Sequence, residues 1–115
     1  MDQYLPSAIK EEVRQVLVKA SAGCDTPPYL TAYQILDRLP LPIKEGLISQ
    51  YSIGGAGNGA SYSAISAISQ SAQSLEGVDI TYIDSVGLTI NVGDNPVIPG
   101  NEHVRIFRLW SETPV

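Results

Sequence analysis

A glycine-rich stretch has the spacing of a phosphate-binding loop. Gly54 and Gly59 are separated by four residues and are followed by Ala60 and Ser61, where a helix is expected to begin. In a P-loop the backbone N–H groups hold phosphates, and a lysine before the Ser neutralises the terminal phosphate. Ala60 stands in that lysine's position, and a helical segment precedes the loop where a P-loop needs a strand. The sequence therefore argues against nucleotide hydrolysis. It leaves a flexible connector or a simple anion site over 54–59.

The remaining reactive side chains form no catalytic pattern in the sequence. His103 is the single histidine and Cys24 the single cysteine, so neither can form a multi-residue metal site with its own kind. No base or cation neighbours Cys24 to activate its thiol. Asp79 and Asp84 lie five residues apart on one predicted strand, so they point to opposite faces. We therefore expect no enzyme activity, no cofactor and no metal.

Composition points to a globular chain with an acidic surface. The 115 residues suit one domain spanning 1–115, and 43% are hydrophobic against 17% charged. Seven Lys and Arg against twelve Asp and Glu give a net charge of −5, which disfavours polyanionic partners. No apolar run approaches the ~20 residues that span a bilayer. The N-terminus lacks a signal-peptide layout, so we expect no membrane partner and a cytoplasmic location.

The first two thirds of the chain have the caps and the apolar spacing of helices, which would position these residues. Thr31 and Gln34 form a capping box at the start of one helix, which Pro40 ends. The helix after the glycine loop carries Tyr62, Ile65, Ile68, Ala72 and Leu75 at helical spacing and is expected to be capped by Ser61. The four expected helical segments are 7–20, 31–39, 43–51 and 61–75.

The last third reads as extended. Apolar residues alternate with others in 78–84 and in 87–92, and a tight turn over 84–87 would join these two strands in a hairpin. Residues 93–102 have the composition of a polar loop with two prolines, and 103–110 are expected to form a third strand with Arg105 and Arg108 on opposite faces. The sequence thus predicts an α+β domain of three to four helices followed by a small antiparallel sheet.

This order of elements resembles a winged helix-turn-helix domain over roughly residues 7–110. VRQVLVKAS resembles the family's first helix, LTAYQILDRLP its second and SYSAISAISQSAQSL its recognition helix, while VDITYIDSVGLTINV with VRIFRLW would form the wing. The resemblance implies a DNA-binding transcriptional regulator that uses helix 61–75 in the major groove and the hairpin 78–92 on the backbone.

Charge favours a different function on the same scaffold. No Lys or Arg lies between residues 45 and 104, so the expected recognition helix has no cation to anchor phosphate. We therefore expect a non-enzymatic protein-interaction, assembly or regulatory module, with a protein partner or second copy favoured over DNA. The residues expected to face that partner are polar but uncharged: Asn58, Ser61, Tyr62, Ser63, Ser66, Ser69, Gln70 and Gln73.

Overall fold

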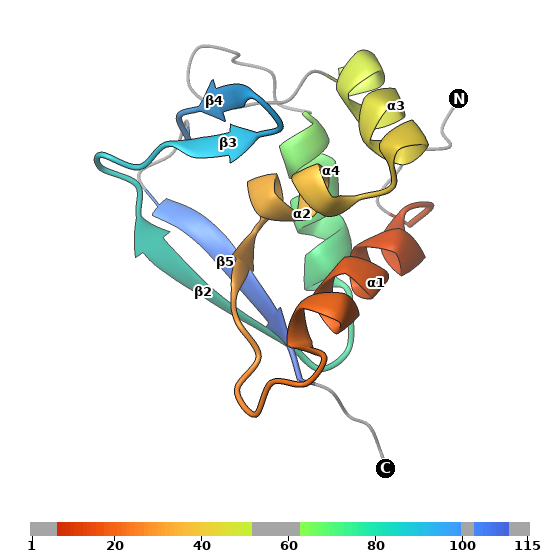
Figure 1. Cartoon of the computed structure of the whole chain (residues 1–115), viewed down its shortest axis with the longest axis vertical. Coiled ribbons are helices and arrows are strands. Elements are labelled where there is room, and N and C mark those ends of the chain that lie inside the picture. The colour runs from red at the N-terminus through yellow and green to blue at the C-terminus, as the bar shows by residue number, and fades with distance from the viewer. Residues whose placement is uncertain (1–6, 52–62, 100–102, 111–115) are drawn as a thin grey trace.

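The computed structural model describes residues 7–51, 63–99 and 103–110, and it has the α+β architecture expected from the sequence. Within these residues, four helices accompany one three-stranded and one two-stranded antiparallel sheet (Figure 1). The elements in chain order are α1 (Lys10–Ser21), β1 (Leu30–Thr31), α2 (Ala32–Arg38), α3 (Leu41–Tyr51), α4 (Ala64–Gln73), β2 (Val78–Asp84), β3 (Ile90–Val92), β4 (Asn95–Val97) and β5 (His103–Leu109).

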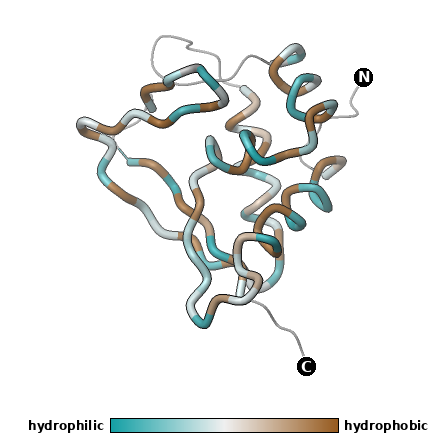
Figure 2. Tube along the Cα trace, viewed as in Figure 1, coloured by the Kyte–Doolittle hydropathy of each residue, from teal (hydrophilic) through white to brown (hydrophobic). Residues whose placement is uncertain are grey.

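The core lies between the helices and one face of the larger sheet. α4 packs against the other three helices and against β2 and β5. Phe107 of β5 is fully buried, as are Ile35 and Leu36 of α2 and Ile68 of α4. Figure 2 shows hydrophobic and hydrophilic residues alternating along α1, the pattern of a helix with one side on the core.

Two helix starts illustrate how local chemistry sets the boundaries. The predicted capping box at α2 is confirmed: the Thr31 hydroxyl accepts from Gln34 N, and the Gln34 side chain accepts from Thr31 N. α4 is capped by Ser63, whose Oγ accepts from Ser66 N at 3.1 Å. The cap expected at Ser61 is therefore wrong, and helix 61–75 is shorter than predicted.

The first helix is also shorter than expected. It begins at Lys10, so the predicted start at residue 7 is wrong. The residue at its N-cap position is Ile9, which has no side chain able to accept a hydrogen bond. Ile9 is instead 2% exposed, so burial in the core fixes this end of the helix.

The predicted hairpin between 78–84 and 87–92 is wrong. All seven residues of β2 pair with β5, from Val78 opposite Leu109 to Asp84 opposite His103. β3 pairs with β4, a strand inside the segment expected to be a polar loop. The turn after β2 does exist, since Leu88 N donates to Ser85 O at 3.0 Å, but it leads the chain away from the sheet and onto α2.

Candidate interaction surface

β2 is an edge strand. The strand order of the larger sheet is β1-β5-β2, so β5 is its one partner among the described strands. Figure 1 shows β2 along the outer margin of the molecule. Its large apolar side chains are exposed, with Ile80 at 39%, Tyr82 at 55% and Ile83 at 37%. A long edge with exposed apolar residues is a template for pairing with another strand.

An aromatic residue and two basic residues gather at the far end of this strand. Tyr82 lies opposite Arg105 in the register, and the Arg105 guanidinium lies 5.6 Å from the centre of its ring. Arg105 Nε donates to the Tyr82 hydroxyl at 3.4 Å. The His103 ring meets Tyr82 edge-on, with ring centres 6.3 Å apart. We call Ile80, Tyr82, His103 and Arg105 the edge surface.

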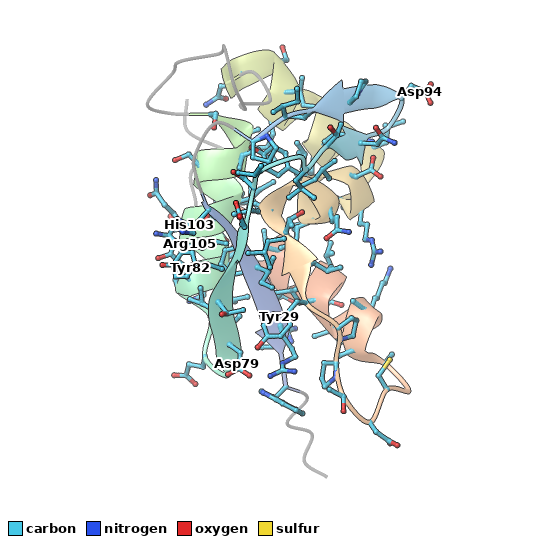
Figure 3. The ribbon with its side chains drawn as sticks, turned by 90° about the vertical axis from the view of Figure 1, so that its left-hand side faces the viewer. Tyr29, Asp79, Tyr82, Asp94, His103 and Arg105 are labelled. Carbon is cyan, nitrogen blue, oxygen red and sulfur yellow. The ribbon has the colours of Figure 1, made fainter. Side chains whose placement is uncertain are left out.

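The edge surface lies on the face of the sheet that α4 covers. The pair Tyr82–Arg105 is two positions from the pair Ile80–Phe107, and alternate residues share a face. Phe107 is in the core, and α4 packs on both strands. Figure 3 shows Tyr82, His103 and Arg105 projecting to the α4 side of the sheet.

Four of the residues predicted to face a partner lie along the outer side of α4, and we call them the α4 face. Gln70 and Gln73 are exposed, and Ser66 and Ser69 are half-buried. Gln70 Nε2 donates to Ser66 Oγ at 3.2 Å, so these two side chains form a local pair. The four residues are Ser66, Ser69, Gln70 and Gln73.

The other predicted partner-facing residues have different outcomes. Ser63 is 7% exposed and caps α4, so its hydroxyl is engaged within the chain. Asn58, Ser61, Tyr62 and the glycine loop 54–59 lie outside the described residues.

A second cluster surrounds Arg108 at the opposite end of the sheet, on the other face. Its guanidinium lies between two aromatic rings, 4.3 Å from the centre of Tyr29 and 4.5 Å from that of Trp110. Arg108 Nη2 is 2.9 Å from Asp79 Oδ2, which also accepts from Trp110 Nε1. Both donors, the indole N–H first and the guanidinium second, lower the pKa of Asp79. This arrangement satisfies the charge of Asp79 internally.

A groove of about 530 Å³ opens on that same face, between the sheet, α2 and the segment before β3. The residues that line it include Ile83 and Ile106 of the sheet and Gln34 and Arg38 of α2. A second cavity of about 480 Å³ lies between α1 and the end of α2. Neither cavity is lined by His103 or Cys24, the single histidine and the single cysteine of the chain.

The Cys24 thiol and the His103 ring each contact a neighbouring group in the structure. The exposed Cys24 thiol donates to the backbone oxygens of Ala20 and Ala22 at 3.7 and 3.8 Å. His103 contacts the Tyr82 ring. Across the part of the chain that the structure describes, no three His, Cys, Asp or Glu residues come close enough to hold a metal ion.

The sequence alone did not identify the edge surface. It correctly separated Arg105 from Arg108, which face opposite sides. The missed signal was that His103 and Arg105 are alternate residues and so share a face. What lies beside them depends on the pairing of β5 with β2, which the wrong hairpin concealed.

Comparison with known proteins gives no relative for this chain. No protein-family model, no curated protein and no solved structure matches it. In the described ranges, no helix has both the length and the apolar character needed to cross a bilayer.

Proposed function

We propose that this chain is a non-enzymatic protein-interaction module on a winged-helix-like scaffold, which binds a protein partner through the edge surface and the α4 face. The observation that carries the proposal is the seven-residue edge strand β2 with Ile80, Tyr82 and Ile83 exposed. Exposed apolar and aromatic groups on a strand edge support strand-mediated recognition, in which backbone groups supply affinity and side chains supply specificity.

The winged-helix part of the proposal rests on the order of elements. A first helix, a capped second helix and a later helix precede the strands, as the resemblance implies. α4 corresponds to the segment that resembles the recognition helix, and β2 and β5 to segments assigned to the wing. The adjoining position of α4 and these strands supports one continuous binding surface.

DNA binding is the second candidate, and one observation favours it. Arg105 and His103 lie on the sheet face that α4 covers, which supplies basic groups next to a helix that has none. Two such groups are few against a net charge of −5, because phosphate contacts from Lys and Arg dominate affinity for duplex DNA. We therefore rank this function below protein binding.

Fluorescence anisotropy with a labelled mixed-sequence duplex separates the two functions. We expect no binding at ~50 mM salt, where a DNA reader binds strongly. Affinity that falls steeply with salt and is lost in Arg105→Ala would replace the proposal with DNA binding.

Quantitative affinity capture from an extract of the source cells tests the protein-binding function directly. Tyr82→Lys should abolish capture of the proteins bound by the wild type, because it adds a charge on the edge surface. Leu41→Lys is the matched control, since Leu41 is 60% exposed on α3 and outside that surface. Equal capture by both variants, or equal loss, contradicts a role for β2.

A further inference from the structure

We infer that the partner is a second copy of this chain, whose β2 pairs antiparallel with this β2 about a two-fold axis at Thr81. The inference rests on the proposed function, since it names the partner for the same surface. The product is one continuous six-stranded sheet in the order β1-β5-β2-β2-β5-β1. A two-fold contact is self-complementary, so each copy offers the same strand.

Symmetry and strand length select the register. Under a two-fold axis normal to the sheet, opposed residues must lie on the same face, so the axis passes through a residue position. An axis at Thr81, the middle of Val78–Asp84, is the one that pairs all seven residues. Moving it to Ile80 or Tyr82 leaves two residues of each strand unpaired.

The side chains are compatible with that register. Ile80 of one copy lies opposite Tyr82 of the other, an aliphatic–aromatic cross-strand pair that stabilises antiparallel sheets. Asp79 lies opposite Ile83 and Asp84 opposite Val78, so no carboxylate directly faces a carboxylate. The strand sequence VDITYID is therefore self-complementary when reversed about Thr81.

Local charge favours a second copy over a strongly charged partner. α4 contains no charged residue. Asp79 is paired with Arg108, and Asp84 lies opposite His103 with Arg105 on the same face. β2 and β5 together carry two carboxylates and two guanidinium groups, so their formal charges cancel although the chain carries −5, and two like-charged chains can meet here. A basic partner would need an acidic surface at this edge.

Disulfide trapping tests the axis directly. In a Cys24→Ser background, Thr81→Cys places two thiols opposite each other, where Cα atoms are about 4.5–5.5 Å apart in an antiparallel pair. That spacing lies within the range that a disulfide requires. Thr81 is exposed, so the substitution leaves the core intact. Oxidised glutathione should convert most of this variant to a covalent dimer.

Val86→Cys in the same background is the control. Val86 is 85% exposed, but the two copies of residue 86 lie far apart in this register, at roughly 3.3 Å per residue over ten positions. It should remain monomeric under the same oxidation. Equal or faster cross-linking at residue 86 would overturn the register.

Sedimentation equilibrium tests the dimer without cross-linking. The weight-average mass should rise with concentration toward twice that of one chain. Ile80→Lys should keep the chain monomeric, whereas Leu41→Lys should dimerise like the wild type. Circular dichroism melts confirm that each variant is folded. A wild-type chain that stays monomeric up to about 1 mM overturns the inference.

The two proposals fail in different ways. A monomeric chain that still captures another protein, with capture lost in Tyr82→Lys, keeps the interaction function and rejects the second copy. A monomeric chain whose capture is the same in Tyr82→Lys and Leu41→Lys rejects both.

Discussion

At the scale of single residues, Asp37 joins three elements through one oxygen. Asp37 Oδ1, at the end of α2, accepts from Lys44 Nζ of α3 at 2.9 Å. The same oxygen accepts from Gly93 N, in the turn between β3 and β4, at 2.7 Å. Gly93 has φ +62°, which a residue with a side chain rarely adopts. One carboxylate thus holds the small hairpin against the helices.

Asp37→Asn should lower the free energy of unfolding at pH 7 by about 1 kcal/mol. The side chain is 39% exposed, so solvent screens the ion pair and keeps the effect modest. The hydrogen bond from Lys44, and secondarily the one from Gly93, lowers the pKa of Asp37. This stabilisation is present above the ordinary carboxyl pKa and is lost as pH falls through the lowered one.

Urea unfolding between pH 7 and pH 2 checks this prediction. The difference between wild type and Asp37→Asn should shrink as pH falls below about 4. Glu45→Gln is the matched control, because Glu45 is an exposed carboxylate of α3 with no partner among the described residues. A pH-independent difference would show that the carboxylate charge is not the cause.

At the scale of elements, α4 is stabilised by core packing and by its N-cap rather than by interactions among the side chains on its exposed side. Its buried side is made of small residues and Ile68, which lets the helix approach its three neighbours closely. Ser71 lies on that side and is 0% exposed. Its hydroxyl has no hydrogen-bond partner within the described part of the chain. A buried polar group without a partner destabilises the fold.

Ser71→Ala should therefore raise the free energy of unfolding by about 1 kcal/mol, because it removes the unpaired hydroxyl and improves helix propensity. Chemical denaturation of the variant measures the change. Ser69→Ala, at a half-buried position of the same helix, should give a smaller gain from propensity alone. A loss of stability in Ser71→Ala would mean that its hydroxyl has a partner in solution.

At the scale of the whole molecule, the strands differ in how well they are held. β5 lies between β1 and β2 and carries the buried Phe107. β3 and β4 form a separate two-stranded sheet of three residues each. Amide exchange is slowest where opening disrupts the core and fastest in short, peripheral pairs.

Hydrogen–deuterium exchange should show β5 as the most protected strand and the β3–β4 hairpin as the least protected. The measurement is mass spectrometry of peptides covering residues 90–97 and 103–109. Comparable protection of both peptides would mean that the small hairpin opens only with the whole domain. The physical reason for the expected difference is that central strands cannot open without exposing Phe107.

The sequence by itself determined features whose causes lie within a few residues. Local chemistry predicted three features: the capping box of Thr31 and Gln34, the end of α2 near Pro40, and the position of Arg105 and Arg108 on opposite faces of one strand. The α+β class followed from the change of hydrophobic period along the chain. Where a cap used no side-chain bond, as at Ile9, the local signal was missing and the predicted boundary was wrong.

Only the tertiary structure decided which strands pair and which edge remains open. Apolar residues alternate with others along Val78–Asp84, and this pattern suits pairing with 87–92 as well as with 103–109. The local pattern therefore does not determine which of the two segments pairs with it. The choice depends on burying Phe107 under the helices and β3 against α2, which are contacts between distant segments. That same choice leaves the seven-residue β2 as an edge strand and sets Tyr82 beside Arg105, because a strand's neighbours are fixed by the whole chain.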